Sequence, residues 1–185
     1  MYLNKTNLFL AISICLIFFF LTYNDVKSVE VKVIDGDTIN LDGKKIRFGG
    51  IDAPESNYRG KKQTCILNNE EVFCGQLSKD KLIKKIGNNR VNCIIEKKKD
   101  KYKRLVGECF IKDESLSVFM VRNGYAFDWP YYSKGKFAKD QEYAKINKLG
   151  LWNMDFEYPW KWKDKIKKNI NNNNFFIYIA AFLTL

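Results

Sequence analysis

An Asp42-Gly43 pair between two short apolar segments constrains this chain more than any other feature. Asp-Gly is typical of a two-residue turn between antiparallel strands. It predicts a hairpin that joins a strand over Thr38–Leu41 to one over Lys44–Ile51. In that register Thr38 lies opposite Arg47, so a cationic side chain stands near the edge of the hairpin.

The same register creates a problem of distance that two glycines can solve. Asp37 pairs with Phe48, and in a flat strand Asp52 would lie about 13 Å further along. The pair Gly49-Gly50 permits a bulge or a sharp bend at this point. We expect that bend to bring Asp52 back toward Asp37.

The hairpin therefore gathers three acids and an arginine: Asp37, Asp52, Glu55 and Arg47. Carboxylates are hard oxygen ligands that suit calcium, and a guanidinium suits a phosphate. The chain has no histidine to act as an alternative acid or base. These residues are what a calcium-dependent phosphodiesterase needs, although an isolated arginine is more often a surface or ion-pair residue.

The rest of the chain alternates between strand and helix patterns. Strands are predicted at Val29–Val33, Arg90–Glu96 and Leu105–Ile111, and helices at Cys74–Ile86, Leu116–Asn123 and Phe137–Lys148. With the hairpin, this order predicts an α+β fold, a small closed five-stranded Greek-key barrel with three helices. Such barrels often bind oligonucleotides.

Composition adds a preference for polyanions. The formal net charge is +11, and 46% of residues are hydrophobic, enough for the core of one domain. A basic protein attracts nucleic acid through counterion release, but the charge alone does not specify a partner.

The ends of the chain predict export. Residues 1–28, with an apolar run over residues 8–21, read as a signal peptide, with an uncleaved N-terminal anchor as the alternative. Residues 29–162 form the predicted domain, including an aromatic tail after Trp152 that packs on it. Residues 163–185 form a Lys/Asn-rich linker, whose lysines are expected to be solvated, and a short apolar end. We expect a secreted or periplasmic protein, with membrane association through the termini as the alternative.

Four cysteines lie beyond the apolar N-terminal run. They allow three connectivities, and we favour Cys65 with Cys74 and Cys93 with Cys109, because antiparallel pairing of the strands around residues 97–104 would join the second pair. Reduced thiols in a cytosolic protein are the alternative. The spacing lacks the close pairs typical of zinc ligands.

Four motifs carry a family resemblance. They are Asp35-Gly36-Asp37-Thr38, Arg47 with Ile51-Asp52-Ala53-Pro54-Glu55, Asp100-Lys101-Tyr102-Lys103-Arg104, and Gly150-Leu151-Trp152. Their order and spacing resemble the staphylococcal nuclease-like family over roughly residues 29–162. The pair Cys74-Gly75, with Cys93 and Cys109, resembles its secreted, cysteine-containing members.

The resemblance implies an OB-fold barrel with three helices that binds one Ca²⁺ and hydrolyses DNA and RNA. It transfers roles by position: Asp37 and Asp52 as calcium ligands through carboxylates, Ala53 as a ligand through its carbonyl, Glu55 as general base, and Arg47 and Arg104 as phosphate-binding cations.

The resemblance also implies contacts with the nucleic acid, single-stranded by preference, through Lys101, Tyr102 and Tyr132. Stacking of bases on tyrosine is tolerant of sequence, which fits an enzyme of broad specificity. Lys103 departs from the glycine that is usual in its loop. A monomer is expected.

Two other function classes fit parts of the sequence. A non-catalytic barrel that binds nucleic acid or protein is one, although none of the five charged site residues is missing. A membrane-tethered DNA-uptake or DNA-processing component is the other, because of the apolar C-terminal end.

Overall fold

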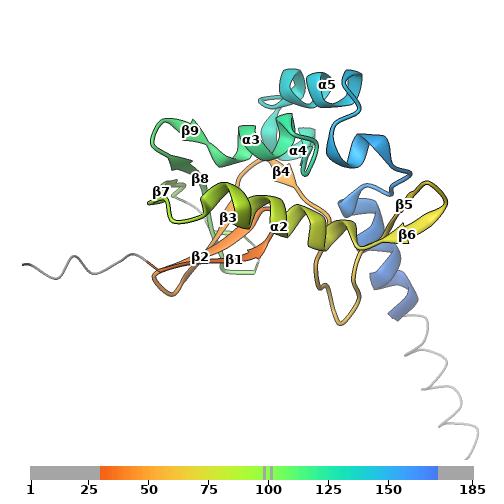
Figure 1. Ribbon diagram of the computed structural model, residues 1–185. Helices are drawn as coiled ribbons and strands as arrows, with labels where there is room; N and C mark the ends of the chain where they lie inside the picture. Colours follow the sequence, from red (N-terminus) through yellow and green to blue (C-terminus); the bar gives the residue numbers. More distant parts are fainter. Residues whose placement is uncertain (1–29, 98, 101, 171–185) are drawn as a thin grey trace, which may run out of the picture.

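The computed structural model describes residues 30–97, 99–100 and 102–170. Its main sheet is mixed, and Figure 1 shows helices packed around it. The strand order is β1-β2-β3-β8-β7, with β9 paired to β8. These strands are β1 (Val31–Asp35), β2 (Thr38–Leu41), β3 (Lys44–Phe48), β7 (Asn92–Ile95), β8 (Leu105–Ile111) and β9 (Glu114–Ser115).

All pairs in this sheet are antiparallel except β3 with β8, which is parallel. The predicted combination of a sheet with several helices is confirmed. Within the described strands, β1 and β7 end the path without pairing to each other. A barrel-like sheet is consistent with this order, while closure and a count of five barrel strands stay predictions.

The predicted hairpin is confirmed in its register. Thr38 pairs with Arg47 and Leu41 with Lys44 across the Asp42-Gly43 turn. The chain then bends at Gly50, whose φ of +78° lies in the left-handed region that favours glycine. Because of this bend, β4 (Ile51–Asp52) leaves the main sheet and pairs with β10 (Phe127–Asp128) instead.

The main core lies between the sheet and two helices, α2 (Cys74–Ile86) and α3 (Leu116–Arg122). Its largest fully buried side chains include Phe48, Leu82 and Met120. The side chain of Ser115 caps α3 by accepting from the amide of Val118. Both helices lie close to their predicted ranges, because periodic apolar residues and the end signals Gly87 and Gly124 are local features.

Two further helices follow along the chain, α4 (Pro130–Ser133) and α5 (Ala138–Ile146), and α5 packs against α3 (Figure 1). The third predicted helix, Phe137–Lys148, corresponds to α5 and is shorter than expected. It begins after the buried Phe137, which caps α5 without a side-chain hydrogen bond. The short α4 was not predicted, because four residues are too few to show helical periodicity.

A second cluster packs beside the main core. It contains the cysteine pair Cys65 and Cys74, with Phe127 and Leu151, and it joins the hairpin of β5 (Cys65–Leu67) and β6 (Glu70–Val72) to the 3₁₀ helix η1 (Gly150–Asn153). Partly buried aromatic residues from the tail cover it: Trp152, Phe156, Tyr158 and Trp160. The prediction that the aromatic tail packs on the domain is confirmed.

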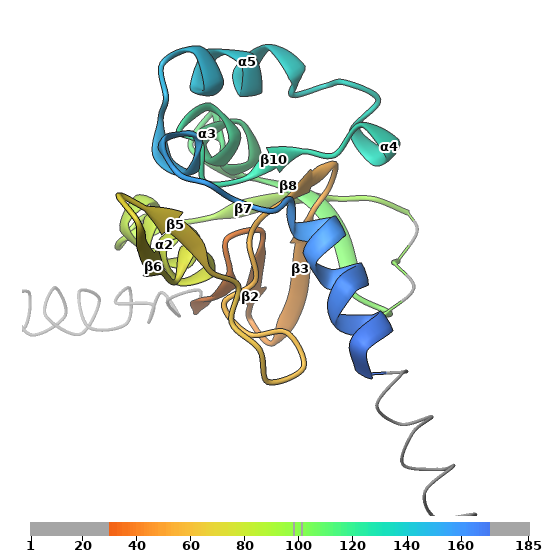
Figure 2. The ribbon, with the colours of Figure 1, turned by 90° about the vertical axis from the view of Figure 1, so that its right-hand side faces the viewer.

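The last described element is a helix over residues 159–170. Figure 2 shows it, in blue, on the side of the molecule that faces the viewer. The predicted domain boundary after residue 162 falls inside this helix, and the division into domains stays a prediction. The predicted signal segment, residues 1–28, and the apolar end after residue 174 lie outside the described residues. No helix in the described part of the chain is both long enough and apolar enough to span a bilayer.

Both favoured cysteine pairs are confirmed as disulfides. Cys65 joins Cys74 at the start of α2, and Cys93 joins Cys109 between β7 and β8. Cys93 and Cys109 are direct partners in the antiparallel register, which is the arrangement expected from the sequence.

Candidate active site

The bend after β3 gathers the predicted acids around Arg47. One guanidinium nitrogen, Nη1, lies 2.5 Å from Oδ1 of Asp37, and the other, Nη2, lies 2.5 Å from Oδ1 of Asp52. Nη2 also donates to the carbonyl of Ile51. Arg47 therefore bridges two carboxylates that lie far apart along the chain. The expectation that the glycines return Asp52 to Asp37 is met.

Asp37 is almost fully buried and has several partners. Its Oδ2 accepts from the amide of Ala53 at 2.8 Å, and its Oδ1 accepts from the hydroxyl of Thr38. Burial alone would raise the pKa of Asp37, but Arg47, Lys163 and these hydrogen bonds together hold that pKa below its ordinary value. Asp37 is thus an anion in the interior, as its place on the core side of the hairpin predicts.

Asp52 has no exposed surface, and its two oxygens have different surroundings. Its Oδ1 accepts from Arg47 and from Lys163, whereas its buried Oδ2 has no hydrogen-bond partner within residues 30–97, 99–100 and 102–170. A buried carboxylate oxygen without a partner is costly unless a cation or a donor reaches it. This orphaned oxygen fits a cation that prefers oxygen ligands.

Glu55 occupies the outer side of the cluster. Its Oε1 accepts from Nζ of Lys163 at 2.9 Å. Burial raises the pKa of Glu55 to about 7, even though the charge of Lys163 opposes the change. Desolvation of the carboxylate therefore outweighs the attraction of one ammonium group.

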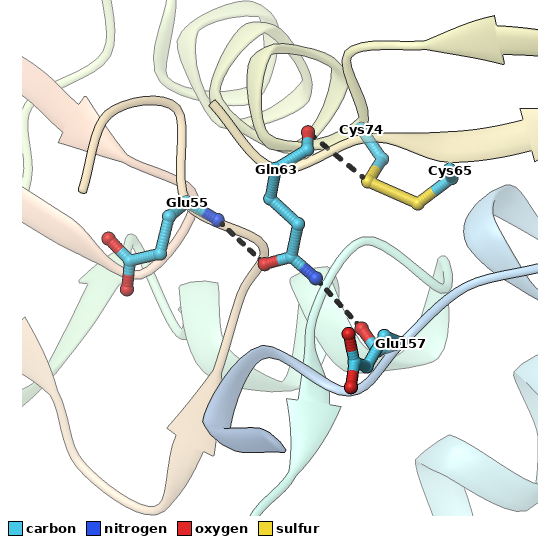
Figure 3. The surroundings of a disulfide bond; sticks show 5 residues. All are labelled: Glu55, Gln63, Cys65, Cys74 and Glu157. Atoms are coloured by element: carbon cyan, nitrogen blue, oxygen red, sulfur yellow. Dashed lines mark hydrogen bonds between the residues drawn. A yellow bond between two sulfur atoms is a disulfide. The ribbon is translucent and has the colours of Figure 1, made fainter. Parts of the chain in front are cut away.

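The backbone of Glu55 is held by the buried Gln63, as Figure 3 shows. The amide of Glu55 donates to Oε1 of Gln63, and Nε2 of Gln63 donates to the carbonyl of Glu157. The amide of Gln63 also donates to the carbonyl of Glu55. Gln63 thus ties the candidate base to the segment before helix 159–170, while two residues further on Cys65 fixes this loop to α2.

Close packing against α2 sets the same backbone segment. A Cβ at Gly75 would lie 2.0 Å from the carbonyl oxygen of Glu55, and one at Gly36 would lie 2.9 Å from the Cβ of Ala53. Real Cβ atoms do not approach so closely, so both positions need glycine. The structure explains the Cys74-Gly75 pair. Cys74 links the start of α2 to Cys65 through a disulfide, and Gly75 leaves room for the backbone of Glu55.

Among the described residues, Arg104 forms no ion pair with the acids of this cluster. Instead it pairs with Asp100, whose Oδ2 lies 2.7 Å from both Nε and Nη2. Burial would raise the pKa of Asp100, but hydrogen bonds to Arg104 hold it below its ordinary value. Lys103 stands in this loop with a φ of +61°, the conformation in which glycine is favoured. The phosphate-binding role of Arg104 stays a prediction.

The predicted substrate contacts lie on the periphery. Tyr102 is exposed, and the guanidinium carbon of Arg104 lies over its ring, 5.4 Å from the ring centroid. Tyr132 is exposed on α4, with its ring 4.5 Å from that of Trp129. Lys101 lies outside the described residues. The roles of these residues in binding stay predictions.

The sequence did not identify Lys163 as a site residue. Its Nζ lies 2.7 Å from Oδ1 of Asp52 and 2.9 Å from Oε1 of Glu55. Burial alone would lower the pKa of Lys163, but Asp52 and Glu55 raise it above its ordinary value. The expectation of a solvated lysine run is therefore wrong at this position. A lysine in a basic stretch gives no local sign of a partner more than a hundred residues away.

The acidic side chains of the cluster could hold calcium only if backbone carbonyls and water supplied further ligands. Over the described ranges, no three acidic, cysteine or histidine side chains lie close enough to hold a metal by themselves. The predicted ligands are two carboxylates, Asp37 and Asp52, and the carbonyl of Ala53. Calcium accepts such mixed oxygen sets completed by water. The orphaned oxygen of Asp52 makes this residue the strongest candidate ligand.

Known proteins resemble the chain over the same region. The family model described as "Staphylococcal nuclease homologue" matches residues 45–154. Of the predicted catalytic and metal-binding residues, this range contains Arg47, Asp52, Ala53, Glu55 and Arg104 but not Asp37, and it ends before Lys163. The relatives include the micrococcal nuclease of Shigella flexneri, 28% identical over 80% of this chain and 86% of its own length.

Two other relatives are 30% identical to this chain. The succinoglycan biosynthesis protein ExoI of Rhizobium meliloti matches over 70% of this chain and 66% of its own length. An uncharacterized endonuclease of Haemophilus influenzae matches over 66% of this chain and 64% of its own length. The matches to these two thus span slightly less than two thirds of each relative. With the family model covering more than half of the chain, the conclusion is that this protein belongs to the staphylococcal nuclease homologue family.

Proposed function

We propose that this protein is a secreted or periplasmic, calcium-dependent endonuclease that hydrolyses phosphodiester bonds of DNA and RNA with little sequence preference, favouring single strands. One observation carries the proposal: Asp37, Arg47, Asp52 and Glu55 converge in one buried cluster, in which Oδ2 of Asp52 finds no partner among the residues that the structure describes. Nuclease relatives support the reaction class, although one relative is named for succinoglycan biosynthesis.

The reaction adds water across one phosphorus–oxygen ester bond. The water oxygen bonds to phosphorus as the bond between phosphorus and the departing ester oxygen breaks. Glu55 takes a proton from the attacking water and later releases it to solvent, and the departing oxygen takes a proton from a solvent water. Asp37, Asp52 and the carbonyl of Ala53 would hold a calcium ion, which would supply positive charge to offset that of the phosphate. Arg47 offsets negative charge on the phosphate oxygens, and Arg104 does so after leaving Asp100.

Export is supported by the two disulfides. Such bonds form and persist in oxidising compartments and are rare in the cytosol. The basic charge of the chain supports a polyanionic substrate.

The test is cleavage of a labelled single-stranded DNA with calcium and with excess chelator. Wild type and Glu55→Gln are compared with Glu71→Gln, which removes an exposed acid on β6. We expect calcium-dependent cleavage that falls at least about a hundredfold in Glu55→Gln and is kept in Glu71→Gln, because general-base catalysis contributes that much.

Either of two results would contradict the proposal. Full activity of Glu55→Gln would remove the assigned base. A wild-type protein that binds the DNA but does not cleave it in calcium or magnesium would instead be a nucleic-acid-binding module.

A further inference from the structure

The ammonium group of Lys163 contacts carboxylates of the candidate metal site. Its Nζ contacts Oδ1 of Asp52 and Oε1 of Glu55, and its side chain is only 15% exposed. It lies outside the range that the family model matches. A lysine ammonium is a compact positive charge, so it satisfies the same carboxylates that a metal ion would.

Packing of helix 159–170 fixes this position. The ring of Trp160 stacks on that of Trp129, with centroids 6.0 Å apart and planes 3° apart, and Trp162 makes an edge contact with Tyr58 at 6.2 Å. Gln63 holds the carbonyl of Glu157 just before the helix. Lys163 therefore reaches the acids from an anchored backbone.

Lys163 and a divalent cation cannot share Asp52 at low cost. Calcium binds carboxylate oxygens at about 2.3–2.6 Å, and Nζ already lies 2.7 Å from Oδ1 of the same carboxylate. Two cations held by one carboxylate in a mostly buried site repel each other strongly, because solvent screens them little. Arg47 already supplies one positive charge to this carboxylate.

We propose that Lys163 is an internal competitor for the divalent cation, so that cation binding displaces its ammonium group from Asp52 and Glu55. This inference rests on the proposed function. Only molecules in which the ammonium has left are competent to bind, so the apparent affinity is reduced by the fraction of such molecules. Lys163 thereby sets the cation concentration at which the site fills.

The test measures calcium binding to the full chain by titration calorimetry, without nucleic acid. Lys163→Met removes the competing charge and keeps the apolar stem. We expect it to bind calcium about tenfold more tightly than wild type, within the usual range of coupling between two ligands. Lys163→Arg keeps a positive charge and is expected to stay within about twofold of wild type, well short of that coupling.

Lys165→Met is the matched control. Lys165 lies on the same helix and is 66% exposed beside Glu157, so its substitution removes the same charge from outside the cluster. Its calcium affinity should stay that of wild type. Circular dichroism verifies the fold of each variant, and Lys163→Gln replaces Lys163→Met if the latter does not fold.

The outcomes separate the two proposals. Equal or weaker calcium binding by folded Lys163→Met, or an equal gain in Lys165→Met, overturns the inference and leaves the proposed function standing. If no variant and no wild-type protein binds calcium, the proposed calcium centre and this inference both fail.

Discussion

At the scale of single residues, the position of Glu55 depends on Gly75, a residue that takes no part in the chemistry. Gly75 faces the carbonyl of Glu55 so closely that an added Cβ would lie 2.0 Å from the oxygen and 2.3 Å from the carbon. Gly75 lies in α2 without a positive φ, so its backbone does not need glycine. The requirement comes from the close contact with the backbone of Glu55 and Ser56.

We therefore expect Gly75→Ala to destabilise the protein. Within a helix this change ordinarily stabilises by about 1 kcal/mol, but here the methyl group must push Glu55 or α2 away, at a cost of about 1–3 kcal/mol as in overpacked cores. Cleavage should fall as well, because Glu55 shifts. Urea unfolding and DNA digestion measure the two effects.

Gly135→Ala is the control for this prediction. A Cβ at Gly135 would meet nothing within 4 Å, so only its φ of +82° resists the change. It should lose about 1 kcal/mol of stability through backbone strain and keep wild-type cleavage. A Gly75→Ala protein as stable and active as wild type would show that the close approach is not maintained in solution.

At the scale of elements, the two disulfides have different neighbours. Cys65–Cys74 joins β5 to the start of α2, beside Gln63 and the backbone of Glu55. Cys93–Cys109 joins β7 to β8. Each closes a short loop, 9 or 16 residues in sequence, so each should contribute about 2–4 kcal/mol.

Their removal should therefore separate stability from activity. We expect both double serine variants to unfold at lower urea concentration. Cleavage per folded molecule should drop only when Cys65 and Cys74 are replaced, because only this pair anchors the loop that carries Glu55. Equal activity of the two folded variants would show that Gln63 and the packing of Gly75 suffice to hold Glu55.

At the scale of the whole molecule, the net charge of +11 governs the encounter with substrate. Binding of single-stranded DNA to the Glu55→Gln variant should weaken at least about tenfold between 50 and 200 mM salt, because each neutralised phosphate releases counterions. Fluorescence anisotropy in the presence of chelator measures this without cleavage. Affinity that does not change with salt would exclude phosphate contacts as the main source of binding.

Several features of the protein could be predicted from the sequence because they are local. Asp42-Gly43 sets the register that places Thr38 opposite Arg47, and helix α2 follows from apolar periodicity and its terminal glycine. The Cys93–Cys109 disulfide could also be predicted, because two neighbouring strands joined by a short loop usually lie side by side in a sheet.

Only the tertiary structure decided which distant groups complete the site. Lys163 and Gln63 carry no local pattern, and Arg104 pairs with Asp100 for reasons that lie in the loop geometry. The sequence by itself determined the hairpin, the bend and the acids that they gather. Which cation those acids contact depends on how helix 159–170 packs on aromatic residues from other elements, and such packing is a property of the whole fold.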